Sequence, residues 1–399
     1  MSNVTVELPD RSELPPAEQF AQHNAEQKAV WEAFRAGRPA RVPCVVATNP
    51  RIILLNPRLN PGRITFQQYT LDPDVMVRVQ VLHAVYVRHH YRVDHEMGLP
   101  KDGWYPWVDF QNVYEAAWLG APISFNESNS PYAEIWLKED NKNEIFDRGM
   151  PDPFRDNGWM QRNWDYYEHF CKLRDKGVEF LGLPVKDARP SGLGTDGPFT
   201  LAAELRGGEI CVDMLADTEY YTQLMTFLTD AIIGRMKAYR KRMGQAEKSD
   251  DFGYADDSVA MLSVEHFRAF VMPYHKRIIE AFWTGKGRLG IHLCGDVQRH
   301  LPVLHREFGI KSFDTGYPID LHEVRRQTSP DTILQGGPTV QLLQNGPAEK
   351  IKEFCRQLLT GPAAREGLFV LREANNLAPN TPPEHVAAMY EACREWGRY

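Results

Sequence analysis

Two residues at the end of a predicted strand have the types and the spacing of a metal site. His292 and Cys294 stand two positions apart, in and just after the apolar segment 288–293. Because side chains alternate along a strand, residues at i and i+2 point to the same side. An imidazole nitrogen and a thiolate together suit Zn²⁺. An HxC pair also arises by chance, so the alternative is a buried histidine bonded to a carbonyl group beside a buried cysteine.

Polar side chains follow several other predicted strands in the same way. Asp256 and Asp257 follow the segment 252–255, and Asp314 follows 310–313. Further polar strand ends lie at Asn49 and Arg51, at 335–338, and at Arg372, Glu373 and Asn375. A single aspartate at such a position more often caps a helix than catalyses, but polar ends on so many strands indicate a site. In a parallel barrel the chemistry lies at these strand ends.

Short strands alternate with helices through the second half of the chain. Four such units follow one another between residues 252 and 371, which predicts a parallel sheet in an α/β fold. We expect a closed (β/α)8 TIM barrel, with a doubly wound open sheet as the alternative. The absence of a GxGxxG motif after the first predicted strand, at 42–47, disfavours dinucleotide binding. Helices are also predicted at 20–36 and 73–92, after a cap at Asp217, and after a cap at Thr381.

The first half of the chain has a different composition. Residues 1–18 are polar and contain prolines, which predicts a flexible N-terminal arm. Residues 100–165 are rich in Trp, Asn, Asp and Pro, which predicts long loop insertions. We therefore expect an N-terminal extension followed by one barrel domain over residues 19–399.

The overall composition excludes several classes of protein. The 399 residues carry a formal net charge of -7, which argues against a nucleic-acid or anionic-membrane surface. No apolar run is long enough to span a membrane, and the polar N-terminus lacks the pattern of a signal peptide. The six cysteines are scattered without a CxxC motif, so we expect reduced thiols and a cytoplasmic location. The oligomeric state stays open.

Several motifs resemble the uroporphyrinogen decarboxylase and corrinoid methyltransferase superfamily. They are GPFTLA at 197–202, LSVEHF at 262–267 after the two aspartates, LQGGP at 334–338 and TPPEH at 381–385. The resemblance covers residues 190–399 well and extends more weakly to about residue 40. It implies a TIM barrel, in agreement with the pattern of strands and helices.

The superfamily contains two chemistries, and the resemblance bears on both. The decarboxylase needs no cofactor and uses an arginine-rich N-terminal RQAGR stretch, whereas here only Arg51 follows the first predicted strand, which argues against heme synthesis. The methyltransferase branch carries HxC and a further cysteine on the last strand. His292 and Cys294 match the first two positions, but Asn375 stands where the cysteine is expected. The site is then depleted, completed by Glu373 or shifted toward oxygen ligands, which puts methylation of a coenzyme M type thiol in doubt.

The resemblance therefore favours a metal-dependent methyltransferase or demethylase. It implies zinc or another divalent metal at the HxC pair, acting as a Lewis acid, while a methyl group moves between a small substrate and a corrinoid. No corrinoid-binding DxHxxG motif occurs, so the corrinoid would arrive on a partner protein or free in solution. Proton transfer is assigned to Asp256, Asp257 and Glu373. Substrate binding is assigned to Asn49, Arg51, Asp314, Arg372 and Asn375.

Two alternatives stay open at this point. One is a cofactor-free decarboxylase or lyase, in which Asp256 or Asp314 stabilises positive charge while Arg51 and Arg372 hold carboxylates of the substrate. The other is a barrel that only binds a tetrapyrrole or a partner protein. The aromatic residues Trp104, Tyr105, Trp107 and Tyr114 suggest it, although such a cluster is more often a core or a lid.

Overall fold

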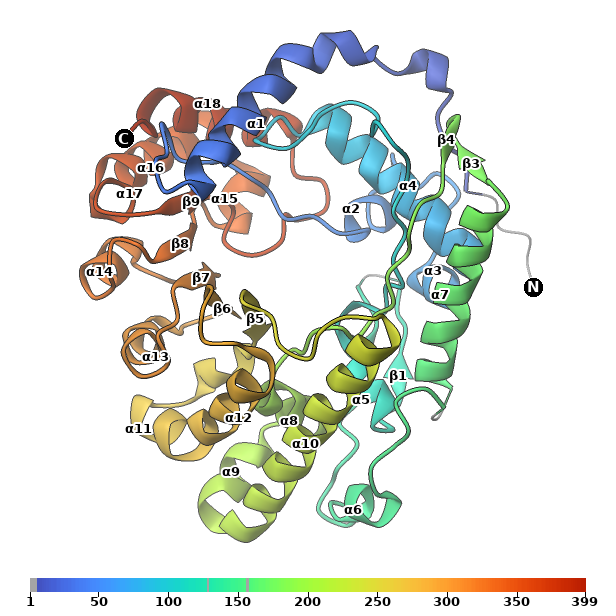
Figure 1. The fold of residues 1–399 in the computed structure, drawn as a ribbon, viewed down its shortest axis with the longest axis vertical. Helices are drawn as coiled ribbons and strands as arrows, with labels where there is room; N and C mark the ends of the chain where they lie inside the picture. Colours follow the sequence, from blue (N-terminus) through green and yellow to red (C-terminus); the bar gives the residue numbers. More distant parts are fainter. Residues whose placement is uncertain (1–5, 128, 156–157) are drawn as a thin grey trace. The chain divides into compact units, whose positions relative to one another are not determined.

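The computed structural model describes residues 6–127, 129–155 and 158–399, which form helices alternating with short strands (Figure 1). Their contacts divide the chain into two compact units. Unit 1 contains the described residues up to 107 together with 169–188 and 313–399. Unit 2 contains the described residues of 108–168 together with 189–312.

Unit 2 is built around two parallel strands. β5 (Phe252–Ala255) pairs with β6 (Leu289–Leu293), and Ala255 lies opposite His292. Helix α12 (Met272–Phe282) packs on β5, because its His275 ring lies edge-on to Tyr254 at 5.1 Å between ring centroids. On the other edge of β5, the Ala255 amide donates to the Thr195 carbonyl at 3.3 Å. The loop before α8 therefore continues the hydrogen bonding beyond β5.

Helix α10 (Thr218–Arg242) is the long helix of unit 2. It begins where predicted, because the Asp217 carboxylate caps it by accepting a hydrogen bond from the Tyr220 amide at 3.3 Å. It contacts α12 and also α8 (Pro198–Arg206) and α9 (Glu209–Ala216). The other elements of this unit are α5 (Tyr114–Trp118), β1 (Ile123–Ser124), β2 (Tyr132–Ala133), α6 (Glu144–Arg148), α11 (Val264–His266) and α13 (Leu301–Phe308).

Unit 1 contains three further strands hydrogen-bonded in chain order: β7 (Ser312–Thr315), β8 (Ile333–Gly336) and β9 (Phe369–Leu371). β8 and β9 are parallel, with Gln335 opposite Val370. The far edge of β9 pairs with the segment 43–45, because Leu371 donates to the Pro43 carbonyl and accepts from the Val45 amide, both at 2.9 Å. The first predicted strand is thus a single parallel bridge between Cys44 and Leu371 rather than a full ladder.

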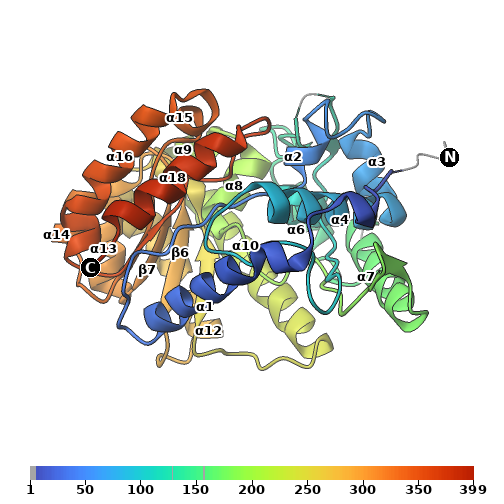
Figure 2. The ribbon, with the colours of Figure 1, turned by 90° about the horizontal axis from the view of Figure 1, so that it is seen from above.

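Helices cover the strands of unit 1. α14 (Leu321–Arg326) contacts β8, and α17 (Pro362–Arg365) contacts β9, while α16 (Ala348–Thr360) and α18 (Pro383–Trp396) lie side by side (Figure 2). The remaining elements are α1 (Ala21–Arg35), α2 (Arg51–Leu54), α3 (Phe66–Leu71), α4 (Pro73–His90), β3 (Glu179–Phe180), β4 (Leu183–Pro184) and α15 (Val340–Asn345). Helix α7 (Trp159–Asp175) contributes residues to both units.

The predicted α/β class with parallel strands is confirmed, and the predicted helices at 20–36 and 73–92 correspond to α1 and α4. The cap predicted at Thr381 is wrong: α18 starts after Pro382, and the Thr381 hydroxyl donates to the Ala378 carbonyl at 2.8 Å instead. Among the described residues, no helix combines the length and apolarity needed to cross a bilayer. The closed eight-stranded barrel stays a prediction.

A buried ion pair generates a prediction for unit 1. Both Asp94 oxygens accept hydrogen bonds from Arg41, and one also accepts from the Cys44 amide at 2.8 Å beside β9. The Asp94 side chain is 0% exposed and that of Arg41 12%. Asp94→Asn removes the countercharge, so the free energy of unfolding should fall by about 3–5 kcal/mol in urea titrations.

The exposed pair between Lys28 and Glu32 provides the control, since both side chains are more than half exposed. Glu32→Gln should leave the unfolding midpoint nearly unchanged. An Asp94→Asn variant as stable as Glu32→Gln would show that this ion pair does not anchor the segment 41–44.

Candidate functional site

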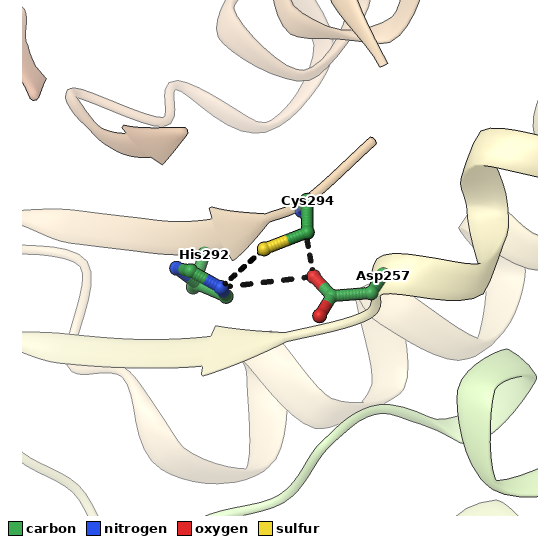
Figure 3. Close-up of side chains that lie close together, drawn as sticks. All are labelled: Asp257, His292 and Cys294. Atoms are coloured by element: carbon green, nitrogen blue, oxygen red, sulfur yellow. Dashed lines mark hydrogen bonds and ion pairs between the residues drawn. The ribbon is translucent and has the colours of Figure 1, made fainter. Parts of the chain in front are cut away.

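Three potential metal ligands meet at the strand ends of unit 2. The His292 Nε2 lies 3.0 Å from the Cys294 Sγ and 3.9 Å from the Asp257 Oδ1 (Figure 3). The ligand atoms of all three residues lie within 4.8 Å of one another. In the described part of the chain, this is the one group of three or more His, Cys, Asp or Glu side chains with that property.

Strand geometry explains why these residues meet. Burial alternates along β6, so His292 and Cys294 face the same side, as predicted from their spacing. Ala255 lies opposite His292 in the parallel register, and Asp257 therefore comes opposite Cys294, two residues further along. The Asp257 Oδ1 accepts a hydrogen bond from the Cys294 amide at 2.7 Å, which fixes the carboxylate beside the thiol.

The donor set fits a divalent metal. Two ligands on a tetrahedral Zn²⁺, each about 2.0–2.3 Å from the ion, lie roughly 3.3–3.8 Å apart. The distances of 3.0 and 3.9 Å bracket this range. One imidazole, one thiolate and one carboxylate leave a fourth position for a substrate atom, as in catalytic zinc sites. All three side chains are only partly buried, so a ligand has access to them.

Asp256, predicted as a proton carrier, is fully buried and its carboxylate is occupied. It accepts hydrogen bonds from the amides of Phe199 and Thr200 at the start of α8, at 3.3 and 2.7 Å. The His275 Nε2 lies 2.7 Å from it on the other side. Gly197 is required here, because its φ is 96° and a Cβ would lie 2.5 Å from the Asp256 Cβ. Through these contacts the Asp256 carboxylate connects the end of β5 to α8 and α12.

A group of buried carboxyl side chains lies in unit 2, and the charges of Asp257 and His292 act on one of them, Asp196. Glu115 on α5 forms a fully buried ion pair with Arg235 on α10. The other Glu115 oxygen accepts from the Asp196 amide at 2.8 Å and from the Thr195 hydroxyl at 3.0 Å. Burial raises the pKa of Glu115, raises that of Asp196 to about 7 and raises that of Glu204 on α8 to about 9. Burial also raises the pKa of Asp257.

A separate polar network lies in unit 1. Arg372 donates to Asp314 at 2.7 Å, to Glu373 at 2.9 Å and to the Asn375 carbonyl at 3.0 Å. Glu373 also accepts from the Ala47 amide at 3.0 Å, and burial raises its pKa to about 7.

The first polar strand end of unit 1 forms a smaller contact of its own. The Asn49 Oδ1 accepts from both the backbone amide and the Nε of Arg51, at 3.0 Å each. These hydrogen bonds orient the Arg51 side chain toward Asn49. The predicted site residues of unit 1 thus form two separate contacts, the Arg372 network and the pair of Asn49 and Arg51.

Sequence reasoning identified His292 and Cys294 but assigned Asp257 to proton transfer rather than to the metal. The signal was present in the pair Asp256–Asp257, since only one of two adjacent strand-end residues can face the same side as the HxC pair. Asp196 was missed, because it stands inside the TDGPFT stretch and reads as part of a helix start. Glu115 and Arg235 gave no sequence signal at all.

The chain is similar in sequence to a known family and to several methyltransferases. A family model described as uroporphyrinogen decarboxylase (URO-D) matches residues 184–396. A methylated-thiol–coenzyme M methyltransferase of Methanosarcina mazei is 27% identical over 203 residues, 50% of this chain and 51% of the relative. A methylcobamide:CoM methyltransferase of Methanosarcina acetivorans is 21% identical over 202 residues, 50% of this chain and 56% of the relative. The chain thus spans about half the length of these relatives.

A solved structure has a similar fold. A methyltransferase from Methanosarcina mazei aligns with a TM-score of 0.60 at 19% identity, over 91% of this chain and 96% of that chain. At this identity the likeness concerns the fold alone, and it extends well beyond the segment matched in sequence.

The raised pKa values predict how stability depends on pH. The unfolded chain loses its carboxyl protons near pH 4, whereas folded Asp196 and Glu204 keep theirs to about 7 and 9. The folded state therefore binds more protons across this window, and its free energy of unfolding falls as pH rises. Glu204→Gln should flatten that slope by up to about 1.4 kcal/mol per pH unit in urea titrations.

The matched control is Glu219→Gln, an exposed carboxyl group on α10. In this variant, the free energy of unfolding should fall with rising pH as steeply as in the wild type. Equal slopes for Glu204→Gln and the wild type would mean that Glu204 titrates alike in the folded and unfolded chain.

Proposed function

Because the chain belongs to the uroporphyrinogen decarboxylase (URO-D) family, we propose that it is a metal-dependent methyltransferase or demethylase of that family. It moves a methyl group between a small substrate and a corrinoid. The observation that carries this proposal is the group formed by His292, Cys294 and Asp257, with ligand atoms within 4.8 Å of one another. Methyltransferase relatives at 21–27% identity support the same kind of reaction.

The three side chains would hold a divalent metal, for which zinc is the best match in ligand type. When bound, the metal supplies Lewis acidity toward the heteroatom that gives up or receives the methyl group. Asp257 provides the third donor from the neighbouring strand end, so Asn375 is not needed as a ligand in place of the cysteine expected there. His292 and Cys294 would contribute their donors from β6, and Asp257 would contribute its donor from the end of β5.

The Asp257 carboxylate also affects which substrate atom a metal at this site would bind. One oxygen, one nitrogen and one sulfur donor form a harder set than two thiolates and an imidazole, and harder sites bind oxygen more readily. We therefore propose a substrate whose methylated atom is oxygen or nitrogen. The corrinoid is proposed to arrive on a partner protein, in line with the methylcobamide named for one relative. Asn49, Arg51 and the Arg372 network stay predictions as substrate contacts.

The decarboxylase alternative gains no support from Arg372. Its guanidinium lies between the carboxylates of Asp314 and Glu373, at 2.7 and 2.9 Å. Two countercharges already surround it, so a substrate carboxylate would have to displace one of them.

Metal content tests the proposal directly. Purified chain reconstituted with Zn²⁺ should hold about one ion per chain by elemental analysis. His292→Ala, Cys294→Ala and Asp257→Asn should each weaken zinc affinity at least about tenfold, because each removes one of three protein ligands. Competition with a chelator measures the affinity, and thermal unfolding checks that each variant folds.

Asp296→Asn is the matched control, since this acidic residue follows the same strand but is 71% exposed and lies beside Arg299. It should bind zinc like the wild type. Reconstituted wild type without bound metal would refute the proposed function, and unchanged affinity in Asp257→Asn would remove Asp257 from the ligand set.

A further inference from the structure

Asp196 is held at its backbone, while one oxygen of its carboxyl group is left without a hydrogen bond. Its amide donates to Glu115, and the preceding Thr195 hydroxyl donates to the same carboxylate while accepting from the Gly197 amide. The Asp196 Oδ2, by contrast, is shielded from solvent and has no hydrogen-bond partner among the described residues. Leaving a shielded carboxyl oxygen unpaired costs free energy, so such an oxygen marks a place where a ligand or a proton is accommodated.

The position of Asp196 relates it to the three ligands. Thr195 is hydrogen-bonded to Ala255 at the end of β5, so Asp196 follows a strand-like segment at the same edge as Asp257. The charges of Asp257 and His292 both act on the Asp196 carboxyl group. Asp196 therefore lies within electrostatic reach of the site without being one of its ligands.

The surrounding charges are unbalanced. Glu115, Asp196 and Glu204 together would carry three negative charges, whereas Arg235 on α10 acts on Glu115 and Asp196 but not on Glu204. The Tyr114 hydroxyl beside them donates to the Gly194 carbonyl at 3.0 Å and supplies no charge. Like charges in a shielded space cannot all ionise, so the group retains protons.

We propose that Asp196 is the general acid–base of the site at His292, Cys294 and Asp257. It donates a proton to the heteroatom that loses a methyl group and accepts the proton in the reverse direction. This inference rests on the proposed function and adds to it the residue that handles the proton.

The step balances without a further reactant. The bond between carbon and the heteroatom breaks, and its electron pair stays on the heteroatom. The carbon forms a bond with the electron pair of the reduced cobalt of the corrinoid, which is the methyl acceptor named above. The proton moves from the Asp196 carboxyl group to the heteroatom, and the solvent then reprotonates the carboxylate. A group whose pKa is about 7 exchanges protons in both directions near neutral pH.

Infrared spectroscopy tests the proton itself. The full chain, with and without Zn²⁺, is titrated while the C=O stretch of protonated carboxyl groups is followed. Two such bands should disappear near neutral pH in the wild type, one from Asp196 and one from Glu373, and Asp196→Asn should keep only the second. Glu204→Gln is the matched control: it should keep both bands and lose one that persists to higher pH. The same number of neutral-pH bands in the wild type and in Asp196→Asn overturns the proposal.

Proton release on ligand binding tests the transfer. Phenol, whose heteroatom is oxygen, is titrated into zinc-loaded chain by calorimetry in two buffers of different ionisation enthalpy, at about pH 8, where Asp196 is mostly ionised. The wild type should release fewer protons to the buffer than Asp196→Asn, by up to about one per site. Asp196→Glu should restore the value of the wild type, which a merely structural role would not require.

The outcomes separate the two proposals. Equal proton release in the wild type and Asp196→Asn overturns the role of Asp196 while leaving the metal site intact. Failure to bind zinc refutes the proposed function, and the infrared titration still decides whether Asp196 holds a proton. If phenol does not bind, the infrared titration decides whether Asp196 holds the proton.

Discussion

The buried ion pair between Glu115 and Arg235 is the interaction on which unit 2 most depends. Both side chains are at most 1% exposed, and Arg235 also donates to the Gly194 carbonyl at 3.0 Å. The second Glu115 oxygen holds Thr195 and Asp196. Helices α5 and α10 are thereby tied to the loop that leads into α8. If the loop moved away and separated this pair, it would leave an unpaired buried charge, which costs free energy. The loop therefore has little freedom to move.

This constraint has an electrostatic consequence for the candidate site. The loop carries Asp196 to the strand edge, where Asp257 and Cys294 add further groups that ionise to anions. A divalent cation held by His292, Cys294 and Asp257 would offset this charge and lower the pKa of every nearby carboxyl group. The excess of acidic groups would therefore favour a cation at the same place where the three ligands could hold one.

Family membership and local geometry constrain different properties. The URO-D match covers residues 184–396 and places the chain in that family. The local geometry decides which side chains meet, because Asp257 from a neighbouring strand end lies with His292 and Cys294. An oxygen donor in this group would favour harder ligand atoms than a third sulfur donor would.

The sequence alone determined the repeating order of strands and helices, the common face of His292 and Cys294, and the cap at Asp217. Each depends on neighbours within a few residues, through strand alternation or capping. Only the tertiary structure decided that Asp257 joins the pair and that Asp196 lies near it. Asp257 comes from a strand end 35 residues before His292, and the parallel register that pairs Ala255 with His292 brings the two strand ends together. Spacing along the chain carries no information about such a pairing, because register is set by packing between strands.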